Sequence, residues 1–325
     1  MKIFISRRIP SPALDRIRAA CASLNAKVDI WQGDDPPPYD QLSARVQGIA
    51  GLLCMLTDRV DAALMDAAGP SLKVISQMAV GYDNIDTTAA AVRGIPIGNT
   101  PGVLTEATAD LTMTLLLAAA RRIPESMAYI REGHWKTWKP MELLGRDLNG
   151  ATLGIIGFGR IGQAVAARAR AFGMHILAYS RSLTPEAAGS QGAEYAPLPD
   201  LLHRADFVSV HTPLNTETRH LINRETLAQM KLDSILINTA RGGVVDSAAL
   251  YEALRAGVIA GAALDVTDPE PIPLTDPLLS LPNVLIVPHI GSATLGTRTK
   301  MALMAADNLI AGLRGEPLPN AVQKR

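Results

Sequence analysis

The segment Gly157-Phe158-Gly159-Arg160-Ile161-Gly162 restricts the fold of this chain more than any other part of the sequence. An apolar run at 152–156 precedes it, as expected of a buried β-strand, and an alanine-rich stretch at 163–172 follows it, as expected of a helix. The first glycine would permit a tight turn, the second a close approach of the backbone to a pyrophosphate, and the third close packing of helix on strand. N–H groups at the helix start would bind the anion. We therefore predict a dinucleotide site that includes Gly157, Gly159, Arg160, Ile161 and Gly162; the alternative is a glycine-rich turn without a ligand.

Short apolar or β-branched runs alternate with segments long enough for helices along most of the chain. The expected strands are 2–6, 49–56, 74–78, 152–156, 175–179, 207–210, 234–238, 261–265 and 284–287. This alternation is typical of βαβ units and a parallel sheet. The continuous apolar character of several runs fits strands that helices cover on both faces. The predicted class is α/β, with doubly wound parallel sheets.

The length of 325 residues favours two domains. Turn residues at 99–102 and 288–291 precede two long helical patterns, at about 104–131 and 296–313. We predict a Rossmann nucleotide-binding domain at 100–289, inserted into a flavodoxin-like substrate-binding domain formed by 1–99 and 290–325. Residues 32–39 are expected to form a surface loop.

The composition is that of an ordinary globular protein, with 48% hydrophobic residues and 31 basic against 31 acidic side chains. Zero net charge disfavours a nucleic-acid-binding role, and the longest apolar stretch, 111–120, is too short to span a membrane. Cys21 and Cys54 are expected to be buried and unpaired, as in a reducing compartment. Residues 1–8 lack the features of a signal peptide. We expect a cytoplasmic protein whose ligands are small molecules and whose site holds no metal ion.

The residues after the expected strand at 175–179 bear on the choice of cofactor. An acidic residue there would accept hydrogen bonds from the ribose of NAD, but the sequence has Ser180, Arg181 and Ser182. Ser180 can hydrogen-bond a 2′-phosphate, and the guanidinium of Arg181 can form an ion pair with it. We predict NADPH as the preferred cofactor, with NADH weaker; the alternative is that Arg181 is a surface residue without this role.

Polar residues follow three later strands, in the segments 238–243, 265–271 and 288–292. Ligands of open α/β sheets bind at the carboxyl ends of the strands, so these segments can converge on one site. With the glycine segment, and with 80–86, 135–140 and 313–317, they resemble the D-isomer-specific 2-hydroxyacid dehydrogenases. The similarity covers essentially the whole chain and is greatest to the glyoxylate/hydroxypyruvate reductases.

The resemblance implies a catalytic set of Arg241, Glu270 and His289. His289 would be the proton donor to the substrate carbonyl oxygen, Glu270 would favour its imidazolium form, and Arg241 would bind the substrate carboxylate. Further cofactor residues are expected to be Thr212, Pro213, Thr239, Asp265 and Gly291, in addition to Arg241 and His289. Substrate contacts are expected from Leu56, Ser292 and the backbone N–H groups of Val80 and Gly81, as well as from Arg241 and His289. Trp138 matches a residue that reaches the active site of a partner subunit, which implies a homodimer; a Trp packed within its own subunit is the alternative.

The predicted activity is therefore the NADPH-dependent reduction of small 2-oxoacids, glyoxylate to glycolate and hydroxypyruvate to D-glycerate. A reductase of larger 2-oxoacids such as 2-ketogluconate is one alternative. A cofactor-sensing binding protein of the same fold is an alternative of another class.

Overall fold

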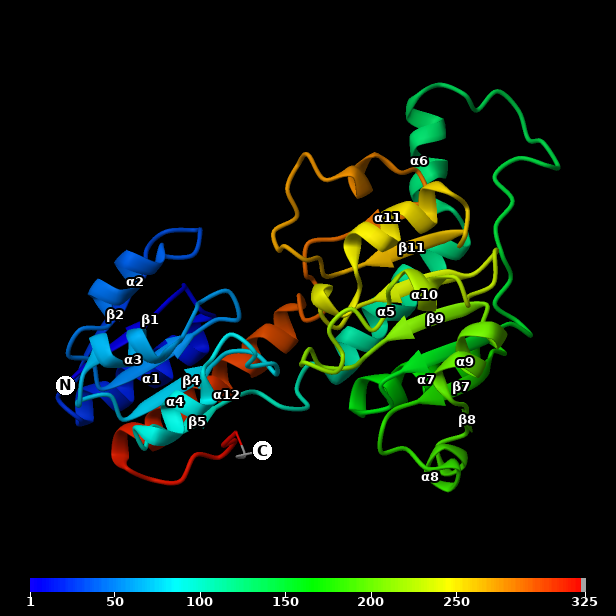
Figure 1. Cartoon of the computed structure of the whole chain (residues 1–325). Coiled ribbons are helices and arrows are strands. Elements are labelled where there is room, and N and C mark those ends of the chain that lie inside the picture. The colour runs from blue at the N-terminus through cyan, green and yellow to red at the C-terminus, as the bar shows by residue number, and fades with distance from the viewer. Residues whose placement is uncertain (323–325) are drawn as a thin grey trace. The chain divides into compact units, whose positions relative to one another are not determined.

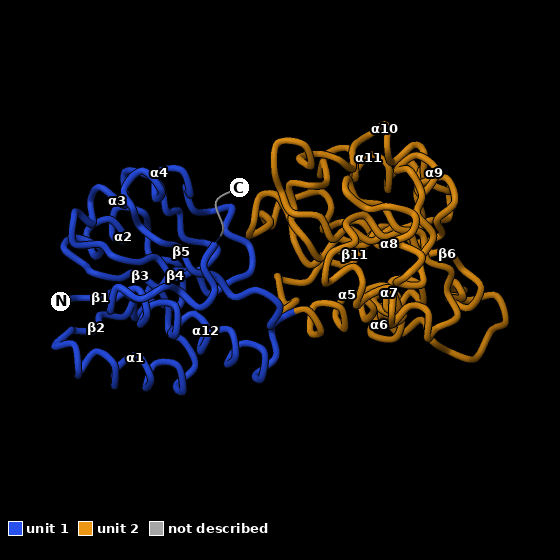
Figure 2. Tube along the Cα trace, turned by 90° about the horizontal axis from the view of Figure 1, so that it is seen from below, with its two compact units in different colours: residues 1–104, 293–325 blue, residues 105–292 orange. Residues whose placement is uncertain are grey.

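The computed structural model describes residues 1–322 (Figure 1). It divides into two compact units, each built on its own parallel sheet (Figure 2). Unit 1 comprises Met1–Leu104 and the chain from Ala293 onward, and unit 2 comprises Thr105–Ser292. The borders lie a few residues later than the expected ones because Val103 and Leu104 pack in a hydrophobic cluster of unit 1. The substrate-binding and nucleotide-binding roles of the units remain predictions.

Unit 1 contains a five-stranded sheet of order β2-β1-β3-β4-β5, with every pair parallel. This is the flavodoxin-like order, in which the sequence of strands reverses between β1 and β3. Its strands are β1 (Lys2–Ile5), β2 (Lys27–Ile30), β3 (Gly51–Cys54), β4 (Val74–Gln77) and β5 (Ile97–Gly98). Its helices are α1 (Ser11–Ser23), α2 (Tyr39–Arg45), α3 (Ala62–Ala68), α4 (Thr87–Val92) and α12 (Leu295–Arg314).

Helices cover both faces of this sheet. On one face, α1 and α12 lie side by side (Figure 2) and bury residues such as Ile17 and Leu309. On the other face, Leu42 of α2, Leu64 of α3 and Ala90 of α4 join a second cluster. Because both faces are covered, β3 and β4 are buried along their whole length.

Unit 2 contains a seven-stranded parallel sheet of order β12-β11-β10-β9-β6-β7-β8. Numbered within the unit, six of these strands have the Rossmann order, and β12 extends that sheet at one edge. The strands are β6 (Thr152–Ile156), β7 (His175–Tyr179), β8 (Glu194–Tyr195), β9 (Phe207–Val210), β10 (Ile235–Asn238), β11 (Gly261–Leu264) and β12 (Val284–Ile286). The helices are α5 (Thr105–Ala120), α6 (Ile123–Arg131), α7 (Arg160–Ala171), α8 (Pro185–Ser190), α9 (Leu198–Arg204), α10 (Arg224–Leu227) and α11 (Ser247–Arg255), with short 3₁₀ turns at Gly242–Val244 and Pro277–Ser280.

Two hydrophobic clusters enclose the sheet of unit 2. Leu116 of α5 and Val165 of α7 belong to the cluster on one face, and Leu201 of α9 and Leu250 of α11 belong to the cluster on the other. The prediction of two doubly wound α/β domains is therefore confirmed.

Most expected strands form near their predicted bounds, and 152–156, 175–179 and 207–210 match them fully. The prediction of a single helix at about 104–131 is wrong, because the chain forms two helices there, α5 and α6. Arg122 separates them with a left-handed φ of 51°, and Pro124 opens α6. A proline lacks the N–H that a continuous helix needs, so it is tolerated only in a first turn. Helix α7 also begins earlier than expected, at Arg160 inside the glycine segment.

Cys21 and Cys54 are both buried and unpaired, as expected. No helix within residues 1–322 is long and apolar enough to cross a membrane.

Candidate active site

The carboxyl ends of the strands in unit 2 gather most of the predicted site residues at one edge of the sheet. The glycine segment follows β6, Ser180–Ser182 follow β7, and Thr212 follows β9. Thr239 and Arg241 follow β10, Asp265 and Glu270 follow β11, and His289 and Gly291 follow β12. Strand order reverses between β6 and β9, which is where open α/β sheets bind their ligands.

The three glycines of the segment differ in what surrounds them. Gly157 has a φ of 96°, and a Cβ there would lie 2.6 Å from the backbone carbon of His211. A Cβ at Gly162 would lie 2.3 Å from the Gly157 carbonyl oxygen. A Cβ at Gly159, by contrast, would meet no described protein atom within 4 Å. The first and third glycines are therefore required by chain packing, whereas the space beside the second is open to a ligand.

Gly159 is also the N-cap of α7. The N–H groups in the first turn of a helix have no acceptor within that helix, so those of Arg160, Ile161 and Gly162 can donate to an anion. An open glycine beside such a helix start fits the pyrophosphate of a dinucleotide.

The loops after β7 and β9 hold the residues predicted to bind the adenosine end. Arg181 is exposed, and its guanidinium donates a hydrogen bond to the carboxylate of Glu217. Glu217 lies in the loop that begins with Thr212 and Pro213, and the sequence analysis did not identify it. Local sequence gives no signal for a pair 36 residues apart.

His211 lies at the start of the same loop, and its Nε2 is 2.8 Å from the hydroxyl of Ser209. Burial lowers the pKa of His211 to about 4. The side chain is therefore neutral near pH 7.

Arg241 lies in a loop that is held by the last residue of β10. The Asn238 side chain donates to the Arg241 carbonyl over 2.9 Å and accepts from the N–H of Ala240 over 3.0 Å. One guanidinium nitrogen of Arg241 donates to the Ala240 carbonyl over 2.8 Å. The guanidinium is thereby held against the backbone of its own loop.

His289 and Glu270 form a direct pair, as predicted. Nδ1 of His289 lies 2.6 Å from Oε1 of Glu270, and the two side chains are 25% and 32% exposed. A carboxylate can only accept, so Nδ1 is the donor and Nε2 faces away from the pair. His289 has a left-handed φ of 52°, and its N–H donates to the Asp265 carbonyl over 2.9 Å.

The carboxylate of Asp265 fixes the two residues after His289. It accepts from the N–H groups of Ile290 over 2.6 Å and of Gly291 over 2.9 Å. Burial raises the pKa of Asp265, although these two N–H groups and His289 oppose the shift. Asp265 therefore holds the loop that positions the histidine ring.

Two threonines of α5 also reach this edge, and the sequence analysis did not assign them to the site. Thr108 donates to the Gly291 carbonyl over 3.3 Å, and the hydroxyls of Thr112 and Thr239 lie 2.9 Å apart. Both threonines lie four residues apart on one face of the helix, which is the signal that could have indicated a polar contact.

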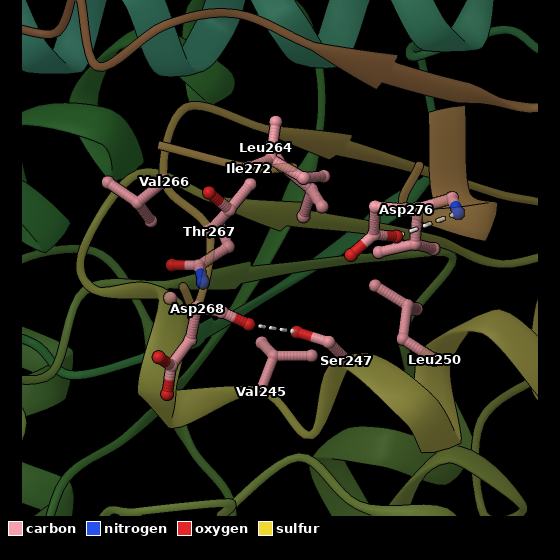
Figure 3. Close-up of a pocket in the computed structure, with 12 residues that line it drawn as sticks. Val245, Ser247, Leu250, Leu264, Val266, Thr267, Asp268, Ile272 and Asp276 are labelled. Carbon is pink, nitrogen blue, oxygen red and sulfur yellow. Dashed lines mark hydrogen bonds between the residues drawn. The ribbon is translucent and has the colours of Figure 1, made fainter. Parts of the chain in front are cut away.

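A small cavity of about 10 Å³ lies beneath the loop that leads to Glu270 (Figure 3). In Figure 3, Ser247 donates to the Asp268 carbonyl over 3.2 Å, and Val245, Leu250 and Leu264 are among the lining residues. This volume holds at most one water molecule, so the cavity is a packing gap and not a substrate site.

A larger cavity, of about 300 Å³, opens at the opposite edge of the same sheet. The first residues of three strands, Ile235, Gly261 and Val284, line it together with Pro124 and Leu144. It is remote from the His289–Glu270 pair because the amino ends of the strands form this edge.

Other predicted substrate residues lie in unit 1, at the carboxyl edge of its sheet. Leu56 follows β3 and is 36% exposed, while Val80 and Gly81 follow β4. Asn84 joins the two loops: its amide donates to the Met55 and Asp58 carbonyls over 3.1 and 2.8 Å, and its oxygen accepts from Gln77 over 2.7 Å.

Ser292 and Trp138 complete the predicted set. Ser292 is the last residue of unit 2. Trp138 is 79% exposed and lies between α6 and β6, so it does not lie at a strand end with His289 and Glu270.

Comparison with known proteins identifies the family. The profile of the "D-isomer specific 2-hydroxyacid dehydrogenase, NAD binding domain" matches residues 113–291. A glyoxylate reductase of Korarchaeum cryptofilum is 50% identical, over 99% of this chain and 96% of the relative. The crystal structure of the TT0316 protein from Thermus thermophilus superposes with a TM-score of 0.92 at 51% identity, covering 99% of this chain and 100% of that one.

A further similar structure is that of an NADPH-dependent glyoxylate/hydroxypyruvate reductase from Sinorhizobium meliloti. It is 34% identical with a TM-score of 0.83, covering 99% of this chain and 97% of that one. The carboxyl-edge site and these matches together confirm the resemblance found in the sequence: the chain belongs to the D-isomer-specific 2-hydroxyacid dehydrogenases and is similar to their glyoxylate/hydroxypyruvate reductases.

Proposed function

We propose that this protein reduces small 2-oxoacids with NADPH, converting glyoxylate to glycolate and hydroxypyruvate to D-glycerate. The single observation that most supports this activity is the His289–Glu270 pair at 2.6 Å, beside a loop that presents Arg241. The names of the similar proteins support the same substrate class.

His289 is the proton donor in the proposed reaction. Glu270 accepts from Nδ1, which leaves Nε2 to deliver a proton to the carbonyl oxygen of the substrate as negative charge develops there. Arg241 binds the substrate carboxylate through its planar guanidinium. When bound, the reduced nicotinamide supplies the hydride. Asp265, through Ile290 and Gly291, keeps the histidine loop in place.

The preference for NADPH is proposed from the loop after β7. Ser180 and Arg181 offer a hydroxyl and a cation to a 2′-phosphate, and no acidic residue stands at 180–182 to exclude it. The Sinorhizobium neighbour is described as NADPH-dependent, which supports this assignment.

Substrate size is assigned to Leu56, on the family resemblance. An apolar side chain there limits what the C3 end of a 2-oxoacid can bear. Ser292 and the backbone N–H groups of Val80 and Gly81 are assigned to the substrate on the same ground.

A homodimer in the cytoplasm is the proposed assembly. An apolar surface on α6 and the segment after it supports the dimer, because exposed apolar patches of this kind mark interaction sites. We call it the α6 surface, and its exposed members are Ile123, Met127, Ile130, Trp135, Trp138, Met141 and Leu144. Leu144 also lines the 300 Å³ cavity, so this end of the α6 surface adjoins a hollow.

The test is the oxidation of NADPH and NADH by the purified protein with glyoxylate, hydroxypyruvate, pyruvate and 2-ketogluconate. Turnover of the two small acids with NADPH in preference to NADH is expected. Faster turnover of 2-ketogluconate would favour the reductase of larger 2-oxoacids. Binding of NADPH without turnover of any 2-oxoacid would refute the enzyme and favour a cofactor-sensing protein.

A further inference from the structure

The side chain proposed to recognise the 2′-phosphate already has an acidic partner. The guanidinium of Arg181 donates to the carboxylate of Glu217, and the two side chains are 79% and 63% exposed. A phosphate that approaches Arg181 would therefore find the carboxylate of Glu217 already bound to the guanidinium.

The backbone of Glu217 is held in place by its own loop. The N–H groups of Glu217 and Thr218 both donate to the side-chain oxygen of Asn215, over 2.9 and 3.0 Å. The Thr218 hydroxyl donates to the carbonyl of Pro213, a predicted cofactor residue, over 2.6 Å. The side chain of Glu217 can rotate, but its Cα is held beside the predicted adenosine site.

The two cofactors would feel this carboxylate differently. A 2′-phosphate has close to two negative charges, and it can displace the carboxylate from Arg181 because an exposed ion pair stabilises little. The displaced carboxylate still lies near the phosphate and repels it. The 2′-hydroxyl of the unphosphorylated cofactor is neutral, so it experiences no such repulsion.

We propose that Glu217 is a specificity-determining residue, which weakens the selection of 2′-phosphorylated over unphosphorylated cofactor by pairing with Arg181 and repelling the phosphate. This inference rests on the proposed function, in which Arg181 binds the 2′-phosphate. A specificity-determining role gives a reason why an acidic residue, Glu217, pairs with the arginine that is proposed to bind the phosphate.

The experiment compares the wild-type protein with Glu217→Gln, which keeps the size of the side chain and removes its charge. Glu194→Gln is the matched control, because Glu194 pairs with Arg204 on the same unit at similar exposure, from β8 and α9. Calorimetry measures the binding of adenosine 2′,5′-bisphosphate and of AMP, which differ only in the 2′-phosphate. Steady-state assays with glyoxylate give kcat/KM for NADPH and NADH.

Glu217→Gln is expected to strengthen binding of the bisphosphate, and to raise kcat/KM for NADPH, by about two- to tenfold, with AMP and NADH unchanged. The gain should shrink as salt is added, because screening weakens the repulsion. Glu194→Gln should change none of these values. Equal changes for both nucleotides, or weaker bisphosphate binding, would overturn the proposal and indicate that the pair serves to cover the adenosine.

Failure of the underlying cofactor assignment gives a different pattern. If the wild-type protein binds the bisphosphate no better than AMP but Glu217→Gln does, the NADPH preference is wrong and the role of Glu217 is supported. If neither protein distinguishes the two nucleotides, both assignments are wrong.

Discussion

The backbone of Gly242 packs directly on the carbonyl group of Thr267, where a Cβ at position 242 would lie 1.9 Å from the Thr267 oxygen. Gly242 follows Arg241, and Thr267 lies in the loop after β11 that reaches Glu270. The two loops that present the proposed catalytic side chains are therefore fixed against each other through their backbones. A side chain at 242 would separate them.

We predict that Gly242→Ala lowers the free energy of unfolding by about 1–3 kcal/mol, the usual cost of overpacking a closely packed position. It should also lower kcat, because Arg241 and Glu270 move apart. Urea denaturation measures the first effect. Gly296→Ala is the control: a Cβ there meets nothing within 4 Å, so no loss is expected. Equal midpoints for the wild-type and Gly242→Ala proteins would contradict the packing argument.

His289→Asn should lower kcat by about 10²–10⁴-fold and change the Kd for NADPH far less, because the proton donor acts mainly in the transition state. Glu270→Gln keeps an oxygen acceptor without the charge, so its loss should be smaller. His220→Asn is a matched control, since His220 has the same left-handed φ of 52°, a conformation that asparagine accepts. A parallel rise in the NADPH Kd would argue against a proton-donor role.

Arg241→Lys should reduce kcat/KM for glyoxylate severely, because a point charge cannot replace a bidentate guanidinium. Steady-state kinetics with saturating NADPH measures the change. Arg255→Lys, in an exposed pair with Glu252, serves as the control. Near-normal glyoxylate affinity in the Arg241 variant would show that another group binds the carboxylate.

His211 should make the protein less stable below pH 6.5. Its pKa is about 4 in the folded state against an ordinary value of 6.5, so the unfolded chain takes up the proton first as the pH falls. The contribution of neutral His211 to the free energy of unfolding is thus fully present above pH 6.5. It is lost progressively as the pH falls from 6.5 to about 4. At pH 5 the loss amounts to about 2 kcal/mol.

His211→Gln should remove this part of the pH dependence, as followed by urea denaturation between pH 4 and pH 7. His175→Gln, at an exposed position, should retain the wild-type slope. An unchanged slope in the His211 variant would mean that other groups cause the acid destabilisation.

Ile130→Glu should convert the proposed dimer into monomers, because it places a charge in the α6 surface. Sedimentation velocity at micromolar concentration measures the assembly. Val92→Glu is the control, since Val92 is 82% exposed on α4, outside that surface. A wild-type protein that sediments as a monomer would refute the dimer.

Short segments of the sequence were sufficient to predict the strands and turns that depend on residues adjacent in the chain. The strand at 152–156 and the glycine turn after it are encoded within a dozen positions. The fold class followed from similar short runs repeated along the chain, and the family from several such motifs in order. The missed strands had weak signals: β2 has the charged residues Lys27 and Asp29 at a sheet edge, and β5 and β8 are two residues long.

Contacts made only by tertiary packing were not predictable. Thr108 meets Gly291 across 183 residues, and Thr112 meets Thr239 across 127. The Arg181–Glu217 pair joins the loops that follow β7 and β9. These loops come close because the two strands lie on either side of β6 in the sheet. No periodicity in the sequence encodes such neighbours. The break between α5 and α6 was missed for another reason, since apolar residues resume at helical spacing after the two arginines, at Ile123, Met127 and Ile130.

The unequal surroundings of the three loop glycines bear on how this protein can change over evolutionary time. A side chain at 157 or 162 collides with the backbone and endangers folding, whereas a Cβ at 159 meets no described protein atom and would enter the space proposed for the dinucleotide. One substitution at Gly159 can therefore abolish nucleotide affinity and leave a well-folded chain. Such a descendant would be a pseudoenzyme, free to acquire another task without first losing its architecture.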